Sequence, residues 1–220
     1  MAHGVPSVTT AQMQRIDAHA AVMGISSMQL MEHAGHRVAA FVRDRTKAKR
    51  IRVLAGKGNN GGDGLVAARF LHAWGFDVRV SVMRKMHPLP AQHWNTLRKL
   101  GVLTAGRMRD ADLIVDALLG YAKENPRGAY VPLIQKANDS GIPILAVDVP
   151  SGLDADTGRA YTPCITATWT VTLALPKKGL VNAKMYVGDL WVADIGIPPE
   201  AYASLRLKVR FPSDCVRLTY

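Results

Sequence analysis

The chain has 220 residues, of which 48% are hydrophobic and 20% are charged. This length and composition fit a single α/β domain that folds without disulfide or metal support, and they exclude a disordered or fibrous protein. No apolar run approaches the roughly 20 residues that cross a bilayer, and the first residues lack a signal-peptide pattern, so we expect a cytoplasmic protein with no membrane span.

The formal net charge of +11 favours anionic partners, which include nucleotide phosphates, nucleic acid and acidic lipid headgroups. Charge alone does not choose among these three classes. The two cysteines, Cys164 and Cys215, lie far apart and outside any C-x-x-C spacing. They predict neither a zinc site nor a disulfide framework, and they suit a reducing cytoplasm.

The first part of the chain predicts two helices. Thr10 caps the first, in which apolar residues recur at helical spacing over residues 13–23, and Gly24 ends it. A capping box formed by Ser26 and Gln29 starts the second helix.

After residue 50, short apolar runs alternate with amphipathic segments. We expect strands at residues 51–55, 78–83, 102–105, 113–118, 144–149, 168–174 and 190–193. We expect helices at residues 65–74, 92–100 and 130–138. Strands that alternate with helices of this length predict a mostly parallel sheet covered on both faces. No repeat or linker divides the chain, so we expect one domain.

Three polar clusters are predicted at one edge of this sheet. They cover residues 56–64, 116–128 and 148–158, each directly after a predicted strand or at its end. Because ligands of such sheets bind beyond the carboxyl ends of the strands, this convergence indicates a binding site.

The first cluster, Gly56–Gly64, is predicted to be a turn between a strand and a helix, where backbone N–H groups and the helix dipole can hold phosphate. Its glycines would allow positive φ and close backbone approach; a tight turn without a ligand is the alternative. The cluster also fits the G-x-G-x-x-G pattern of dinucleotide dehydrogenases. That reading needs an acidic residue at the end of the next strand, where Arg84 and Lys85 stand instead, with Asp77 at the strand's beginning.

Five segments in order resemble the N-terminal YjeF-type domain, the NAD(P)HX epimerase family, over nearly the whole chain. They are Leu-Met-Glu-His-Ala-Gly at 30–35, Asn-Asn-Gly-Gly-Asp-Gly at 59–64, Val-Asp-Ala-Leu-Leu-Gly at 115–120, Val-Asp-Val-Pro-Ser-Gly-Leu-Asp at 147–154 and Thr-Leu-Ala-Leu-Pro-Lys at 172–177. The resemblance implies a Rossmann-like three-layer αβα sandwich with a mostly parallel central sheet, as one domain spanning residues 1–220.

Members of this family interconvert the R and S epimers of hydrated NADH and NADPH (NADHX and NADPHX) in nicotinamide nucleotide repair. The resemblance therefore implies an isomerase, with the ATP- or ADP-dependent dehydratase that uses the S epimer in a separate chain; it also admits a homodimer. The substrate-binding residues that it implies are Asn59, Asn60, Gly61, Gly62, Asp63, Gly120, Tyr121, Ala122, Lys123, Glu124, Asn125, Pro126 and Asp148. The potassium ligands that it implies are Asn60, Asp116 and Ser151.

The chemistry of these ligands agrees with that assignment. An amide oxygen, a carboxylate and a hydroxyl from neighbouring strand ends suit a hard cation, which would offset the charge of Asp116 beside a phosphate. The alternative for Asp116 is a turn or helix-cap role.

Asp148 is the predicted catalytic residue. It follows an apolar strand, so its carboxyl would emerge where partial desolvation favours acid–base work. The epimerised carbon carries a hydroxyl next to the ring nitrogen, and its loss and return requires proton transfer to and from oxygen. The alternative is that Asp148 only orients the Pro150–Gly152 turn.

Other polar residues near these motifs have less specific roles. Lys177 and Lys178 either reach the diphosphate or the reacting face, or are solvated. Asp154 and Asp156 are predicted to form turns. The sequence departs from the family in the loop Tyr121–Gly128, where a glycine-containing loop is usual, and at His33, where asparagine is usual.

Three further features allow more than one interpretation. His33 and His36 lie one helical turn apart, but packing or surface roles are expected because no third metal ligand has suitable spacing. The four tryptophans are expected in the core. The basic stretch Arg43–Arg52 can be a solvated face or an RNA-binding surface, as in non-enzymatic scaffold domains of the same fold. Retention of Asn60, Asp63, Asp116, Asp148 and Ser151 favours the enzyme.

Overall fold

A computed structural model describes residues 5–104 and 108–219 of the chain. Its centre is an eight-stranded sheet in the order β3-β2-β1-β4-β5-β6-β7-β8. The strands are β1 Arg50–Ala55, β2 Asp77–Val82, β3 Leu103–Thr104, β4 Leu113–Ala117, β5 Ile144–Val147, β6 Trp169–Leu173, β7 Asp189–Ala193 and β8 Cys215–Arg217. Neighbouring strands run parallel except β8, which is antiparallel to β7. The chain leaves β1 towards β2 and β3 and then returns to β4, so the strand order reverses between β1 and β4.

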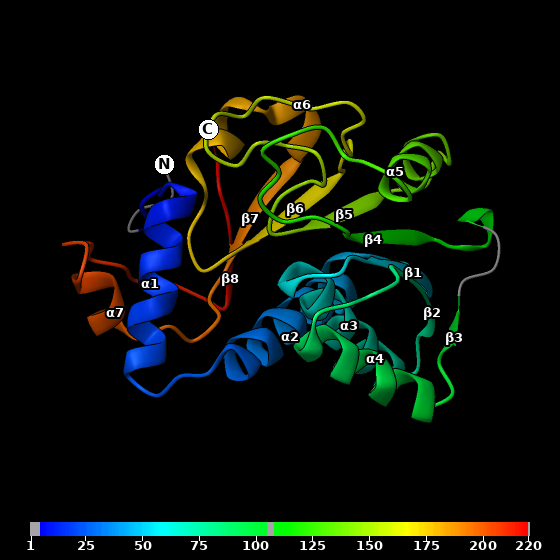
Figure 1. Cartoon of the computed structure of the whole chain (residues 1–220), viewed down its shortest axis with the longest axis horizontal. Coiled ribbons are helices and arrows are strands. Elements are labelled where there is room, and N and C mark those ends of the chain that lie inside the picture. Colours follow the sequence, from blue (N-terminus) through cyan, green and yellow to red (C-terminus); the bar gives the residue numbers. More distant parts are fainter. Residues whose placement is uncertain (1–4, 105–107, 220) are drawn as a thin grey trace.

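Helices cover both faces of the sheet, as the sequence predicts (Figure 1). They are α1 Thr10–Val22, α2 Ser27–Arg45, α3 Asn59–Ala73, α4 Pro88–Lys99, α5 Tyr130–Asn138, α6 Lys184–Val187 and α7 Pro199–Ala203. Helices α2, α3 and α4 lie on one face and α5 and α6 on the other, while α1 lies beside α7 at the β8 end of the sheet (Figure 1). The fold is therefore the predicted three-layer αβα sandwich with a mostly parallel sheet.

Residues that alternate along each strand pack into different cores. Val53 in β1 and Val115 in β4 belong to the core under α2 and α3, whereas Leu54 and Ile114 belong to the core under α5. All four side chains are fully buried. Strands buried on both faces are the usual result of a parallel sheet between two helical layers.

The predicted elements agree with the structure most closely where local signals are strong. Helix α5 has the predicted bounds, and the capping box of Ser26 and Gln29 starts α2. Helix α1 is capped by Thr9 rather than Thr10, and Met23 lies beyond its end. Residue 105, at the end of one predicted strand, lies outside the described residues. Strand β8 and the short helices α6 and α7 were not predicted, because none of them has a long periodic pattern.

The glycine-rich segment is a helix start rather than an extended turn. Helix α3 begins at Asn59, six residues earlier than predicted, with Gly58 as its N-cap. The expectation of positive φ in this segment is wrong, because the left-handed glycines of the described chain lie elsewhere. Close approach explains the glycines instead: a Cβ on Gly56 would overlap the carbonyl oxygen of Leu118, and one on Gly61 would overlap that of Gly56.

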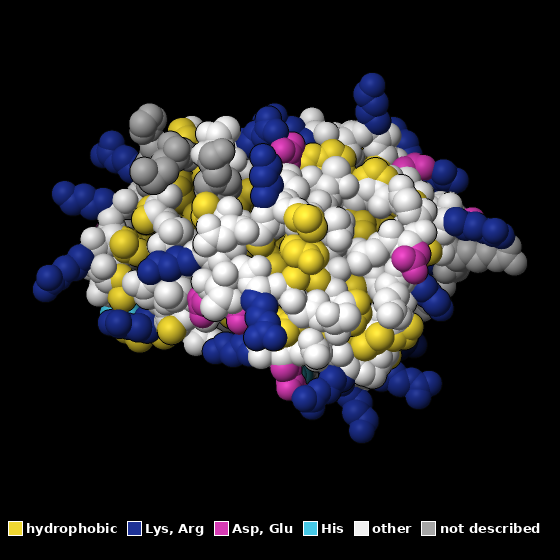
Figure 2. All heavy atoms as spheres, turned by 90° about the horizontal axis from the view of Figure 1, so that it is seen from above, with side chains coloured by type: hydrophobic (Ala, Val, Ile, Leu, Met, Phe, Trp, Pro, Cys, Tyr) yellow, Lys and Arg dark blue, Asp and Glu magenta, His cyan; other side chains and the backbone are white. Residues whose placement is uncertain are grey.

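Several side chains with ambiguous sequence roles pack against the core. The ring of His36 lies edge-on to Phe70, with centroids 4.8 Å apart. The guanidinium carbons of Arg43 and Arg45 lie 4.5 and 4.7 Å from the ring centroids of Trp74 and Trp191. On the face in Figure 2, Lys and Arg side chains are spread around the rim rather than gathered in one block. Within the described ranges, no helix is long and apolar enough to span a membrane.

Candidate functional site

The ends of β4 and β5 and the start of α3 meet at one cavity of about 520 Å³. Six of the predicted substrate-binding residues line it: Asn59, Asn60, Asp63, Gly120, Tyr121 and Asp148. The site lies beside the reversal of strand order, where the loops after β1 and β4 diverge and leave room for a ligand. The fold therefore brings residues from three distant sequence segments to the same cavity.

Behind the cavity wall, Asp116 and Ser151 are joined by hydrogen bonds. Both side chains are fully buried. The backbone N–H of Ser151 donates to Oδ2 of Asp116 over 2.8 Å, and its hydroxyl donates to Oδ1 over 2.7 Å. Burial raises the pKa of Asp116 to about 6, and the hydrogen bonds from Ser151 and Leu118 oppose that rise.

Asn60 reaches this pair through the backbone of Leu119. Its Nδ2 donates to the Leu119 carbonyl over 3.0 Å, and the N–H of Leu119 donates to Oγ of Ser151 over 2.8 Å. The Oδ1 atom of Asn60 is buried and has no hydrogen-bond partner among the described residues. A buried, unsatisfied oxygen costs free energy unless a ligand or ion meets it. This oxygen, linked through Leu119 to the buried carboxylate, fits the donor set of a hard monovalent cation.

Asp148 is held in an unusual backbone conformation. Its φ is 64°, in the left-handed region that residues other than glycine rarely adopt. The N–H of Leu173 and the hydroxyl of Thr172 donate to its Oδ1 over 3.0 and 3.1 Å. Lys177 donates to the same oxygen. Three donors on one oxygen hold the carboxyl group in a fixed position.

Lys177 is a buried cation rather than a solvated lysine. Only 1% of it is exposed, whereas Lys178 next to it is exposed. Its ammonium also donates to the carbonyl of Leu173 over 2.9 Å and lies 5.7 Å from the ring centroid of Tyr121. Of the alternatives from the sequence, the solvated one is therefore wrong for Lys177.

Two more carboxyl groups line the same cavity, and the sequence singled out only one of them. Burial raises the pKa of Asp63 well above its ordinary value, and the charge of Asp148 adds to the rise. Burial also raises the pKa of Asp17 to about 6, although the residue is partly open to solvent. Asp17 was missed because it lies on α1, whose return to the strand ends no local pattern predicts.

The loop that follows β5 ties α1 to this site. Asp154 accepts hydrogen bonds from the N–H groups of Asp156 and Thr157, both over 2.9 Å, which confirms its predicted turn role. The carboxylate of Asp156 accepts from the N–H and the hydroxyl of Thr10, both over 2.6 Å. This contact fixes the start of α1 and with it the position of Asp17.

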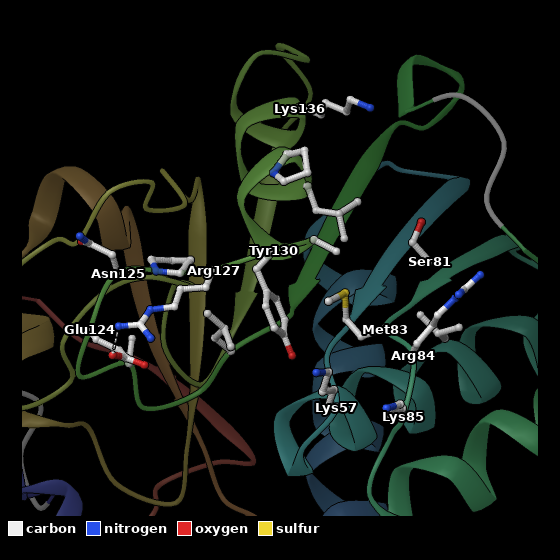
Figure 3. A pocket seen from close by; sticks show the side chains of 18 of the residues that line it. Lys57, Ser81, Met83, Arg84, Lys85, Glu124, Asn125, Arg127, Tyr130 and Lys136 are labelled. Carbon is white, nitrogen blue, oxygen red and sulfur yellow. Dashed lines mark hydrogen bonds and ion pairs between the residues drawn. The ribbon is translucent and has the colours of Figure 1, made fainter.

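A second cavity, of about 1320 Å³, is lined by the residues drawn in Figure 3. Leu119, Tyr121 and Tyr130 line both cavities. The remaining predicted substrate-binding residues of the loop line the larger one: Ala122, Lys123, Glu124, Asn125 and Pro126. The variant loop therefore contributes to the walls of both cavities, through Tyr121 in each and through residues 122–128 in the larger one.

Gly61, Gly62 and His33 line neither cavity. A Cβ on Gly62 would overlap the side chain of Met31, so Gly62 packs against α2, and Gly61 packs against the carbonyl of Gly56. His33 lies close to Gly196, with Nδ1 3.0 Å from the position of a Cβ on that glycine. Histidine in place of the family's usual asparagine at position 33 therefore changes the packing near Gly196 rather than a cavity wall.

Comparison with known proteins agrees with this geometry. The family model for the YjeF-related protein N-terminus matches residues 27–179. A bifunctional NAD(P)H-hydrate repair enzyme of Moorella thermoacetica is 40% identical and aligns with 90% of the chain, but the chain spans only 42% of that relative. Other bifunctional relatives are likewise spanned to 39–43% of their length.

Relatives of about the same length as this chain are named for the epimerase alone. The NAD(P)H-hydrate epimerase of Cenarchaeum symbiosum is 36% identical, with 88% of this chain and 97% of that protein aligned. The crystal structure of yeast ynu0 superimposes with a TM-score of 0.83 at 27% identity, covering 97% of this chain and all of that one. By its family match, its relatives and its fold, the chain belongs to the family of the YjeF-related protein N-terminus.

Proposed function

We propose that this protein is an isomerase that interconverts the R and S epimers of hydrated NADH and NADPH. The observation that carries the proposal is the position of Asp148, fixed by Lys177 in the wall of a cavity that also holds the start of α3. Relatives named NAD(P)H-hydrate epimerase, at 36% and 37% identity over most of the chain, support it.

The start of α3 supplies the diphosphate site in this proposal. Gly58 caps the helix without a side-chain hydrogen bond, so the first N–H groups of the helix are left for a ligand. Asn59 and Asn60 in the first turn line the cavity. Backbone N–H groups and the positive helix end favour phosphate oxygens.

The reaction needs a proton on a hydroxyl that departs and returns. Protonation of the hydroxyl oxygen lets the C–O bond break as the ring nitrogen's lone pair forms a C=N bond. Water then adds to the opposite face and gives up a proton. We assign both proton transfers to Asp148: its carboxyl group gives a proton to the departing hydroxyl, which leaves as water, and then takes a proton from the water that adds. Its Oδ1 is held by Lys177, Thr172 and Leu173. Asp17 and Asp63, whose pKa values are raised by burial, hold protons more readily than ordinary carboxyls.

We also propose a bound potassium ion. Asn60, Asp116 and Ser151 would hold it, and it would balance the buried carboxylate near incoming phosphate. The unsatisfied Oδ1 of Asn60 supports the assignment. When bound, the ion would supply positive charge beside Asp116, and it would hold together the loops that carry Leu119 and Ser151.

The proposed setting is the cytoplasm, where residues 1–220 form one epimerase domain that works together with a dehydratase. Cys164 and Cys215 are free thiols, as a reducing compartment requires. Bifunctional relatives join epimerase and dehydratase names in one protein, which supports coupled use of the two reactions. A homodimer stays a prediction.

A coupled assay tests the function. The protein is given purified R epimer together with a dehydratase that accepts only the S epimer, and NADH or NADPH formation is followed by absorbance. We expect a rate well above the uncatalysed interconversion. A rate equal to the reaction without protein contradicts the proposal. Tight RNA binding at near-physiological salt in a filter assay, without epimerase activity, would favour the scaffold alternative instead.

A further inference from the structure

The two cavities are neighbours, with volumes of about 520 and 1320 Å³. They share Leu119, Tyr121 and Tyr130, and Asp148 lies only in the smaller one. A dinucleotide has two nucleosides joined by a diphosphate. If the nicotinamide end reacts at Asp148, the other nucleoside extends into the larger cavity.

The walls of the larger cavity suit a purine nucleoside. Apolar side chains from the sheet and from α5, among them Met83 and Leu133, form part of its lining together with the ring of Tyr130. Met83 is 8% exposed, so its side chain is a fixed part of the wall. Ligand sites generally combine such apolar surfaces with a few charged groups that fix orientation.

The charged groups on the β1 and β2 side are all cations. Lys57 follows β1, and Arg84 and Lys85 follow β2; Figure 3 shows them across the cavity from the segment of Glu124 and Arg127. In the described part of the chain, none of these three cations forms an ion pair, whereas Arg127 pairs with Glu124 over 2.8 Å.

The backbone and the sequence near Arg84 and Lys85 strengthen the positive character. Lys85 has a φ of 58°, so the chain turns sharply directly after β2. Residues 81–87 contain no acidic residue, and Asp77 lies at the opposite end of β2. A carboxylate after this strand would accept from a ribose 2′-hydroxyl and repel a 2′-phosphate, whereas basic residues there attract the phosphate.

We infer that the larger cavity binds the adenosine half of the substrate, and that Arg84 and Lys85 recognise a 2′-phosphate on its ribose. The protein therefore prefers NADPHX to NADHX. This inference rests on the proposed function for the identity of the substrate, while the recognition of a 2′-phosphoadenosine group can be measured without it.

The experiment compares 2′,5′-ADP with 5′-ADP by titration calorimetry at near-physiological salt. Wild type is expected to bind 2′,5′-ADP about tenfold more tightly or better, because a phosphate gains charge-assisted hydrogen bonds. The double variant Arg84→Ala/Lys85→Ala should lose that preference and keep its affinity for 5′-ADP within about threefold, the scale of ordinary context effects.

The chain offers a matched control in Arg98 and Lys99. They are exposed in the last turn of α4, line neither cavity and carry the same two charges. Arg98→Ala/Lys99→Ala should keep the preference for 2′,5′-ADP. Equal binding of both nucleotides by wild type, or equal loss in the two double variants, overturns the inference, because the first shows no recognition and the second shows only bulk charge.

An activity measurement separates this inference from the proposed function. The ratio of kcat/KM for NADPHX to that for NADHX should exceed one in wild type and fall towards one in Arg84→Ala/Lys85→Ala. A protein that prefers 2′,5′-ADP but does not epimerise either substrate overturns the proposed function and leaves the phosphate site standing. An active protein that binds 2′,5′-ADP and 5′-ADP equally overturns this inference and leaves the proposed function standing.

Discussion

The ammonium group of Lys177 donates to Oδ1 of Asp148 in an ion pair that is almost closed to solvent, with 1% of the lysine side chain and 12% of the aspartate side chain exposed. Burying two charges costs several kcal/mol of hydration for each, so such a pair is weak evidence for stability. Both residues line the cavity. Their arrangement is better explained by the need for a fixed carboxylate at a reaction site.

Asp148→Asn should abolish most of the catalysed epimerisation. A general acid–base group contributes about 10²–10⁴-fold to the rate, so a loss of that size is expected in kcat. The coupled assay measures it, and circular dichroism checks that the variant is folded. Asp139→Asn, which removes an exposed aspartate after α5, should behave as wild type. Undiminished turnover in Asp148→Asn removes this residue from the mechanism.

Lys177→Met should destabilise the protein by about 3–5 kcal/mol, because it leaves the carboxylate of Asp148 buried without its partner. Urea unfolding measures the change. The double variant Lys177→Met/Asp148→Asn should regain part of the lost stability, since no buried charge remains. A double variant that is destabilised by the sum of the two single changes would show that the residues do not interact.

Potassium should stabilise the protein and strengthen nucleotide binding relative to tetramethylammonium. At ten times its dissociation constant an ion adds about 1.4 kcal/mol, which raises Tm by about 3–6 °C for a chain of this size. Asn60→Ala should lose this response, while Asn95→Ala, an exposed change on α4, should keep it. Identical melting curves and affinities in the two salts argue against the ion site.

Asp63→Asn should gain stability relative to wild type as the pH rises. Burial, followed by the charge of Asp148, raises the pKa of Asp63 in the folded state, so the folded protein holds a proton that the unfolded chain releases. Wild-type stability then falls above the unfolded pKa of about 4, by at most about 1.4 kcal/mol per pH unit. Asp63→Asn has no ionisable group at this position, so its unfolding free energy should not fall with pH for this reason. Urea unfolding at pH 5 and pH 8 measures it, and an equal slope for both proteins contradicts the assignment.

Gly61→Ala should destabilise the protein by about 1–3 kcal/mol, the usual cost of forced overpacking. Its Cβ would overlap the backbone carbonyl of Gly56. Gly56 directly follows β1, so a shift of this carbonyl would disturb the end of that strand. Gly58→Ala is the matched control, because a Cβ there meets nothing within 4 Å. Equal unfolding free energies for the two variants would show that the close approach is unimportant.

The order of strands and helices could be predicted because it depends on local patterns. Apolar runs such as 113–117 form buried strands, and capping residues such as Ser26 and Gln29 start helices wherever the rest of the chain lies. Helix α3 shows where this fails, because glycines discourage a helix locally, yet residues 59–64 are helical. The glycines at 61, 62 and 64 are explained by close packing, since a Cβ on each would overlap Gly56, Met31 and Ala117, respectively.

The site was predictable as far as its residues follow the ends of strands. Parallel strands place their carboxyl ends at one edge, so Asn60 and Asp148 were expected together and line one cavity. The burial of Lys177, the raised pKa of Asp17 and the presence of two neighbouring cavities were not predictable, because each depends on segments that meet only after folding. The sequence by itself thus determined the family, the order of the longer elements and the edge of the sheet at which the polar segments gather. The tertiary structure alone decided which charged groups lose contact with water and face one another, because burial and long-range contact are properties of the packed chain.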